Sequence, residues 1–207
     1  MAREKVYDRA YFEHWYRRSE VGVGADDFVA RKVRLAVAAT EYLLGRPIAR
    51  VLDVGCGEAP WRAQLRRLRP GVAYEGVDSS LYAVERYGRT RNIRLGTVGD
   101  LGTLGLRGRF DLVVCSDVLH YVRTPEVRAG LAAMHRLCDG LAFIEMFTNA
   151  DRIEGDHDAL QDRSPAAYHR MLAEAGFTPV GLHLYACRRV ARGLTSLERG
   201  AASRGVR

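Results

Sequence analysis

From Arg50 onward, short apolar runs alternate with longer amphipathic segments. The runs have strand length and the segments have helix length, so this order predicts a parallel sheet covered by helices on both faces. The candidate strands are Arg50–Val54, Ala73–Val77, Ile93–Val98, Phe110–Cys115, Leu141–Phe147 and Pro179–Tyr185. The candidate helices are Pro60–Arg69, Leu81–Tyr87, Pro125–Cys138 and Pro165–Ala175, the last ending before Gly176.

A different pattern precedes the first strand. Five aromatic residues gather in a short span, namely Tyr7, Tyr11, Phe12, Trp15 and Tyr16, and a long helical pattern follows from Asp26 to Leu44. An aromatic stripe at helical spacing is typical of a packed core. The start of the chain therefore predicts helices that pack against the sheet or cover one of its edges.

Length and composition indicate one domain without a membrane span. The chain has 207 residues and no linker-like stretch. No apolar run approaches the roughly 20 residues that cross a bilayer, and the charged segment Met1–Arg9 lacks the apolar core of a secretory signal. The cysteines stand singly at positions 56, 115, 138 and 187, which predicts a reducing cytoplasm and neither a zinc site nor a disulfide framework.

The formal net charge of +7 raises the question of a nucleic-acid partner. One arginine cluster lies on a candidate helix and a second lies in the C-terminal tail, where it comprises Arg188, Arg189, Arg192, Arg199, Arg204 and Arg207. Neither cluster is interleaved with the aromatic residues of a base-stacking surface. The arginine content is equally typical of a GC-rich genome, so nucleic acid is a disfavoured partner.

The most informative segment joins the first candidate strand to the first candidate helix. Gly55 and Gly57 lack the Cβ atoms that would keep a ligand from the main chain, and Pro60 suits the first turn of a helix. Asp78 follows about 20 residues later at the end of the next strand, where a nucleotide-binding fold places a carboxylate on a ribose. Pro60 replaces the third glycine of the dinucleotide fingerprint, so a pyrophosphate cradle is disfavoured.

The run from Val51 to Gly57 resembles the first motif of the class I S-adenosylmethionine-dependent methyltransferases, and the wider resemblance covers roughly Arg50 to Tyr185. It implies an α/β fold with a doubly wound, mostly parallel Rossmann-like sheet of six or seven strands. It also implies a single domain made of an N-terminal helical lid (1–48), a cofactor-binding core (49–187) and a basic tail (188–207). The tail does not read as a seventh strand.

The resemblance also implies where S-adenosylmethionine would bind. Asp53 and the backbone of Gly55, Cys56 and Gly57 would meet its methionine part, and Asp78 with Ser79 would meet its ribose. The other residues assigned to the cofactor are Gly99, Asp100 and Leu101 at the adenine, Ser116 and Asp117 at the floor of the site, and Tyr11 and Tyr16 on the lid. No metal is expected.

The segment Ser116–Tyr121 decides the expected acceptor. It lacks the Asn/Asp-Pro-Pro-aromatic motif of nucleic-acid amino-methyltransferases, and its Asp-Val-Leu-His run is closer to small-molecule enzymes of the family. His120 is the candidate general base because imidazole titrates near physiological pH. Packing against the cofactor is the alternative role for His120, and Glu145 and His157 are weaker catalytic candidates.

The polar segment from Asn149 to Arg163 is a candidate substrate loop, since it follows a strand at the ligand edge of the sheet. It contains Glu154, Asp156, His157 and Asp158, which could bind an amine or a metal but are interpreted more simply as solvated residues. The resulting hypothesis is methyl transfer from S-adenosylmethionine to a small-molecule oxygen or nitrogen. The alternatives are a methyltransferase of RNA or ribosomal protein and a non-catalytic S-adenosylmethionine-binding protein; the oligomeric state is left open.

Overall fold

One sheet organises the molecule, with strand order β3-β2-β1-β4-β5-β7-β6. In this computed structural model residues 5–18, 26–152 and 156–200 are described. The strands are β1 (Arg50–Val54), β2 (Ala73–Asp78), β3 (Ile93–Leu95), β4 (Phe110–Ser116), β5 (Cys138–Glu145), β6 (Thr178–Gly181) and β7 (Leu184–Ala186). β7 runs antiparallel to both of its neighbours, and the other pairs are parallel. The mostly parallel, Rossmann-like sheet is therefore confirmed.

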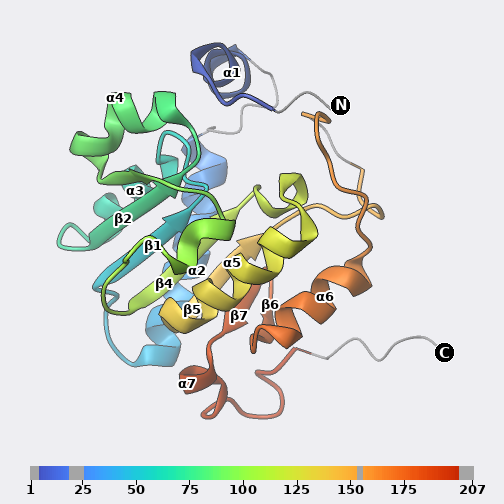
Figure 1. Cartoon of the computed structure of the whole chain (residues 1–207). Helices are drawn as coiled ribbons and strands as arrows, with labels where there is room; N and C mark the ends of the chain where they lie inside the picture. Colours follow the sequence, from blue (N-terminus) through green and yellow to red (C-terminus); the bar gives the residue numbers. More distant parts are fainter. Residues whose placement is uncertain (1–4, 19–25, 153–155, 201–207) are drawn as a thin grey trace.

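Helices cover both faces of the sheet (Figure 1). They are α1 (Arg9–Phe12), α2 (Asp26–Leu44), α3 (Pro60–Leu68), α4 (Leu81–Arg91), α5 (Thr124–Leu137), α6 (Pro165–Glu174) and α7 (Arg188–Ala191). On one face α5 packs against α6, β4 and β5, whereas α2 packs against α3, β4 and β5 on the other. Proline begins α3 and α6 at the position where its missing N–H is harmless.

The N-terminal region divides into two parts with different positions. α2 belongs to the helical layer on the sheet, where Val33 and Ala36 are fully buried. Only residues 5–18, which comprise α1 and a π-helical turn from Glu13 to Arg18, lie over the ligand edge of the sheet. Within the described residues, the segment over this edge is thus shorter than the helical lid expected over residues 1–48, and its role as a lid stays a prediction.

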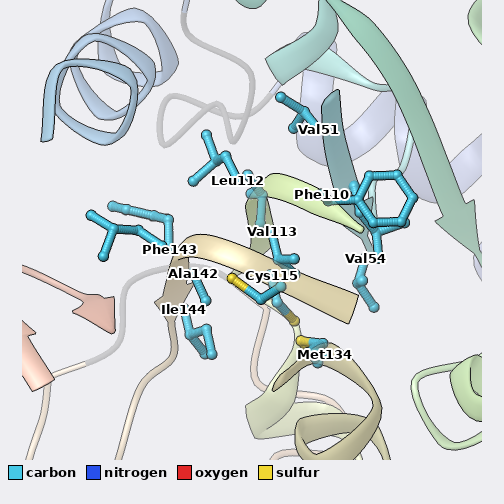
Figure 2. Packing of buried hydrophobic residues seen from close by; sticks show 14 of the residues in the cluster. Val51, Val54, Phe110, Leu112, Val113, Cys115, Met134, Ala142, Phe143 and Ile144 are labelled. Atoms are coloured by element: carbon cyan, nitrogen blue, oxygen red, sulfur yellow. The ribbon is translucent and has the colours of Figure 1, made fainter. Parts of the chain in front are cut away.

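The central strands are buried on both faces because helices cover each side. Val51, Leu112, Val113 and Ile144 have no exposed surface and form part of a continuous apolar core with Met134 of α5 (Figure 2). Each such side chain contributes about 1.5–3 kcal/mol of burial free energy. This core fixes the ends of β1 and β4, where the strand order of the sheet reverses and where parallel α/β folds bind their ligands.

The C-terminal part of the sheet differs from the expectation of one strand over Pro179–Tyr185. Gly181, Leu182 and His183 have positive φ angles of 114°, 51° and 64°, so the chain reverses there and forms the β6–β7 hairpin. The sequence pattern did not show this turn because Leu182 and His183 seldom adopt the left-handed region. The seventh strand therefore exists, and it precedes Cys187 rather than lying in the basic tail.

Other differences are confined to element ends. β3 ends at Leu95, before the expected Val98, and β5 ends at Glu145, which leaves Met146 and Phe147 in the following loop. A 3₁₀ turn over Gly99–Gly102 follows β3. In the tail, Arg188–Ala191 forms the short α7, while Arg204 and Arg207 lie outside the described residues.

Candidate active site

The glycine turn after β1 lies against the end of β2. The backbone N–H groups of Gly55 and Cys56 both donate to the carbonyl of Val77, at 2.8 and 3.2 Å. Gly55 and Gly57 have φ angles of +72° and +51°, which disfavour a side chain at either position. The turn that the sequence predicted is therefore built from main-chain geometry that requires glycine.

Asp78 holds this turn through its carboxylate. Oδ2 accepts the N–H of Gly57 at 2.6 Å, and Oδ1 accepts the N–H of Ser80 at 2.8 Å. Burial raises the pKa of Asp78, although both backbone hydrogen bonds act in the opposite direction. Each carboxylate oxygen retains a second lone pair, so the group can accept ribose hydroxyls while it holds the turn. The neighbouring Ser79 is exposed.

Asp53 lies in β1, just before the glycine turn, and is buried. Its side chain is 2% exposed and accepts the hydroxyl of Tyr74 from β2 at 2.8 Å. Burial raises the pKa of Asp53 to about 7, and the nearby Asp78 adds to the shift. Two carboxyl groups at the ends of adjacent strands therefore make this edge favourable for a cationic ligand.

The N-terminal aromatic segment lies directly over the turn. A Cβ atom built on Gly57 would stand 2.5 Å from Oη of Tyr16 and 3.2 Å from the ring of Phe12. Phe12 is 2% exposed and packs with Tyr16, Tyr11 and Tyr82 at ring-centroid distances of 4.9 to 5.5 Å. Tyr16 therefore contacts the glycine turn, and Tyr11 lies one turn earlier in the same segment, next to Phe12.

The segment predicted to contact the adenine, Gly99–Leu101, makes its contacts within its own loop, with α5 and with the core. Asp100 is exposed, and its carboxylate accepts Oγ1 of Thr97 at 2.7 Å within its own loop. Leu101 is 1% exposed and belongs to the core, while Gly99 lies against Glu126 of α5. Their assignment to the adenine ring stays a prediction, since the contacts of Asp100 and Leu101 are explained by the loop and the core.

The end of β4 brings the next group of predicted residues to the same edge. Ser116 donates its hydroxyl to Glu145 at 2.6 Å, and the same carboxylate oxygen pairs with Lys32 of α2 at 2.5 Å. Asp117 has a φ of +65°, and burial raises the pKa of its carboxyl group. A Cβ atom on Gly55 would lie 2.3 Å from the side chain of Val118, so this strand end borders the glycine turn directly.

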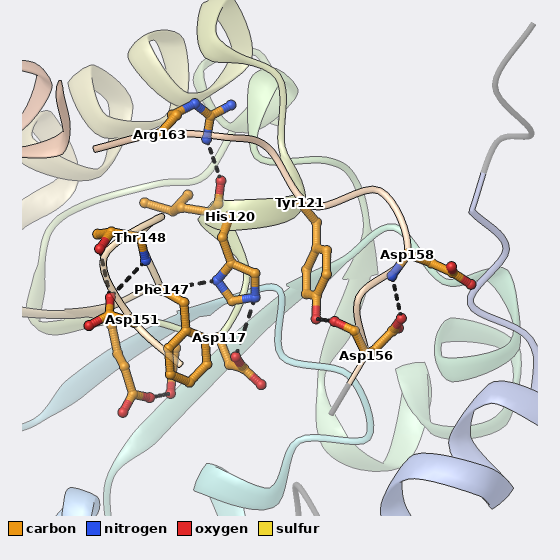
Figure 3. Close-up of polar contacts among 12 residues, drawn as sticks. Asp117, His120, Tyr121, Phe147, Thr148, Asp151, Asp156, Asp158 and Arg163 are labelled. Atoms are coloured by element: carbon orange, nitrogen blue, oxygen red, sulfur yellow. Dashed lines mark hydrogen bonds and ion pairs between the residues drawn. The ribbon is translucent and has the colours of Figure 1, made fainter. Parts of the chain in front are cut away.

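His120 is buried next to Asp117 (Figure 3). Its Nδ1 accepts the N–H of Phe147 at 3.3 Å, which leaves the proton of the neutral ring on Nε2. Nε2 has no hydrogen-bond partner and lies 3.5 Å from Oδ1 of Asp117. Burial lowers the pKa of His120 to about 4, with Lys5 contributing. This geometry favours a neutral ring that packs beside Asp117, and the general-base role stays a prediction.

The predicted substrate loop after β5 closes the other side of the site. Tyr121 donates its hydroxyl to the carbonyl of Asp156 at 2.9 Å (Figure 3). The side chain of Asp156 also pairs with Lys5, at 2.5 Å. Arg163 is buried and donates to the carbonyl of Leu119 at 2.9 Å, which holds the segment carrying His120. His157 is exposed, and Glu154 lies outside the described residues.

Sequence reasoning missed several side chains that shape this site. Val118 covers Gly55, Lys32 pairs with Glu145, and Lys5 pairs with Asp156. One signal was available, because Lys5 and Lys32 are the two lysines in a chain whose other basic residues are arginine and histidine. Their partners, however, are more than 100 residues away along the chain and could be found only in the folded structure.

Across the described ranges, no group of three or more His, Cys, Asp and Glu side chains is placed to hold a metal ion. In the same ranges, none of the helices combines the length and apolarity that a membrane span requires.

The sheet order, with β7 antiparallel, and the glycine turn at the end of β1 define the class I methyltransferase fold. The family profile described as a methyltransferase domain matches residues 26–182. The chain belongs to this family, and the S-adenosylmethionine-dependent methyltransferase class that the motifs predicted is confirmed. A search of curated protein sequences gave no match.

Solved structures of low sequence identity share the fold. A sugar N-methyltransferase from a Streptoalloteichus species has a TM-score of 0.63 and 18% identity, covering 91% of this chain and 96% of its own. An amino pentose methyltransferase from Micromonospora echinaspora, solved with S-adenosylmethionine, has a TM-score of 0.59 and 20% identity, with coverages of 89% and 99%. A methyltransferase from Archaeoglobus fulgidus that depends on the same cofactor has a TM-score of 0.61 and 18% identity, with coverages of 82% and 75%.

Proposed function

We propose that this chain transfers the methyl group of S-adenosylmethionine to an oxygen or nitrogen of a small molecule. The observation that carries the proposal is the cradle formed by Gly55, Gly57 and Asp78, in which a Cβ atom at either glycine would collide with Val118 or Tyr16. Asp78 already accepts two backbone N–H groups and can also accept ribose hydroxyls. These residues fit the cofactor that the family uses.

In this proposal the chain's own residues hold and enclose the reactants. Asp53 and the glycine turn hold the methionine part of the cofactor, Asp78 and Ser79 hold the ribose, and Tyr16 shields the turn from water. The bound cofactor supplies an electrophilic methyl group on a sulfonium. Catalysis then comes mainly from alignment of the acceptor in a dry pocket, with Asp117 and His120 at its wall.

A small-molecule acceptor is supported by the residues at the end of β4. Ser116, Asp117, Val118 and Leu119 stand where nucleic-acid amino-methyltransferases carry their proline-containing motif. The structural neighbours described as sugar and amino pentose methyltransferases are consistent with such an acceptor. The four free, buried cysteines favour a reducing compartment, so we also propose a cytoplasmic location.

Calorimetry with S-adenosylmethionine and S-adenosylhomocysteine tests cofactor binding. We expect a dissociation constant on the order of micromolar for the folded protein. Incubation with labelled methyl donor and a metabolite extract then tests transfer. Absence of heat with both ligands would refute the proposal, and binding without transfer would support the non-catalytic alternative.

The same assay separates RNA from small molecules. Methylation of RNA with a steep salt dependence, lost when Arg188, Arg189 and Arg192 are neutralised, would support the RNA alternative. Counterion release makes such binding weaken sharply as salt concentration rises. Methylation of a compound in the extract with weak salt dependence is the expected result.

The role of His120 can be read from turnover. His120→Ala should lower kcat by about 10²-fold without changing cofactor affinity if the residue takes the acceptor proton. In that case the wild-type rate rises with pH through an ionisation that the variant lacks. If His120 only packs beside Asp117, the loss is smaller and the pH profile keeps its shape.

A further inference from the structure

The ammonium group of Lys5 lies among three tyrosine rings. Its Nζ is 3.6 Å from the ring centroid of Tyr121, 5.5 Å from that of Tyr7 and 5.6 Å from that of Tyr11. Tyr7 and Tyr11 themselves meet edge to face at 5.0 Å. Cations within about 6 Å of aromatic rings are attracted to the ring faces, and several rings together form a binding site for ammonium groups.

A carboxylate completes this arrangement. Oδ2 of Asp156 lies 2.5 Å from Nζ of Lys5, and the carbonyl of Asp158 accepts a further hydrogen bond at 3.1 Å. The Lys5 and Asp156 side chains are only 11% and 10% exposed. A buried ammonium requires a charged partner and hydrogen-bond acceptors, and both are present here. We call Tyr7, Tyr11, Tyr121 and Asp156 the cation cage.

The cation cage borders the candidate active site. The ring centroids of Tyr121 and His120 are 4.2 Å apart, and Nε2 of His120 lies 3.5 Å from Oδ1 of Asp117. The hydroxyl of Ser80, two residues after Asp78, donates to the carbonyl of Tyr7 at 2.6 Å. The cation cage therefore adjoins the proposed cofactor residues on one side and His120 with Asp117 on the other.

The second lysine gives an internal comparison. Lys32 also pairs with a carboxylate, that of Glu145, at 2.5 Å. Its ammonium, however, lies over the ring of Phe28, 4.2 Å from the ring centroid. Phe28 is 48% exposed. A salt bridge alone therefore does not require the three-ring enclosure around Lys5.

We propose that the cation cage is a subsite for a protonated amine or quaternary ammonium group of the acceptor, and that Lys5 fills the subsite until the acceptor displaces it. This inference rests on the proposed function because it assigns the cage to the acceptor of methyl transfer. A protonated amine has no free lone pair, so the caged group anchors the acceptor and another of its atoms receives the methyl group.

Choline and its uncharged analogue 3,3-dimethyl-1-butanol are matched probes, used with protein saturated with S-adenosylhomocysteine. Lys5→Ala removes the side chain from the cage, and calorimetry should then show choline binding about tenfold more tightly than the analogue. The preference should disappear when Tyr121→Leu is added. Arg9→Ala, which removes an exposed cation from the same segment, should bind choline as weakly as wild type.

Equal binding of both probes by folded Lys5→Ala would overturn the cation cage. That result is distinct from failure of the proposed function, which is read in the separate titration with S-adenosylhomocysteine.

A second measurement uses the wild-type chain and does not depend on the variant retaining its N-terminal contacts. An amine-acylating reagent followed by mass spectrometry should label Lys5 at least threefold faster with saturating choline, because a displaced ammonium becomes accessible. Lys32 in the same digest is the reference, and the uncharged analogue should have no effect. Unchanged labelling of Lys5 at saturating choline would overturn the displacement.

Discussion

The proposed cofactor side of the site (Asp53, Gly55–Gly57 and Asp78) and the proposed acceptor side (Lys5, Asp117, His120, Tyr121 and Asp156) are built in different ways. The cofactor side joins two adjacent strands through backbone N–H groups that Asp78 and Val77 accept. The acceptor side joins side chains from the N-terminal segment, the end of β4 and the loop after β5. Stability and cofactor binding are thus coupled on the first side, whereas the second depends on contacts between distant segments.

The largest expected effect tests the cofactor side. Asp78→Ala removes a carboxylate that holds Gly57 and Ser80, and it also removes the proposed ribose contacts. Hydrogen bonds to a charged group contribute about 1.5–3 kcal/mol each, so affinity for S-adenosylhomocysteine should fall about 100-fold or more in calorimetry. Asp27→Ala on the surface of α2 is the control. Unchanged affinity in Asp78→Ala would separate this carboxylate from cofactor binding.

The next effect concerns stability where the two sides meet. Gly55→Ala places a Cβ atom 2.3 Å from Val118 at a φ of +72°, and the free energy of unfolding should fall by about 2–3 kcal/mol in denaturant titrations. Val118→Ala should restore part of this loss. Gly45→Ala is the matched control, because its φ is +67° with no atom within 4 Å, so only about 1 kcal/mol of backbone strain is expected.

Asp53 on the first side and His120 on the second should make the folding stability change with pH in opposite directions. Burial raises the pKa of Asp53 to about 7 from 3.8, so its contribution to stability is full below pH 3.8 and is lost as pH rises to about 7. Burial lowers the pKa of His120 to about 4 from 6.5, so stability is lost as pH falls from 6.5 to about 4. Asp117, Asp156, Glu145, Lys5 and Arg163 surround this ring.

Thermal unfolding between pH 4.5 and 7 measures this difference. Asp53→Asn should make Tm rise more with pH than in wild type, and His120→Gln should make it rise less, by a few degrees over the interval. Asp27→Asn should leave the wild-type slope unchanged. Identical slopes in all variants would show that neither buried group carries the pH dependence.

The smallest effect tests how the N-terminal segment is attached over the cofactor side. Arg17 donates to both carboxylate oxygens of Glu58, at 2.7 and 2.9 Å, and its side chain is 42% exposed. An exposed ion pair contributes about 0–1 kcal/mol, so Arg17→Met should weaken cofactor binding by less than about fivefold. The control is Arg31→Met, which removes another exposed ion pair. A loss above tenfold would mean that the segment is held mainly by this pair.

The doubly wound sheet could be predicted because its central strands are short apolar runs, because proline lies in the first turn of α3, α5 and α6, and because Ser80 caps α4. The glycine turn and Asp78 were equally readable, since their spacing along the chain corresponds to adjacent parallel strands in register. The β6–β7 hairpin could not be read, because its turn uses left-handed angles at Leu182 and His183. Tertiary packing stabilises those angles against the local preference of both residues.

Local sequence therefore determined the fold class, the cofactor-side turn and the family to which this chain belongs, because backbone angles and strand register depend on residues close together or regularly spaced. Only the tertiary structure decided which nitrogen of His120 faces Asp117 and that Lys5 meets Asp158 across 153 positions of sequence. Such contacts depend on how separate loops close over the sheet edge, and no local preference of the residues involved encodes that closure.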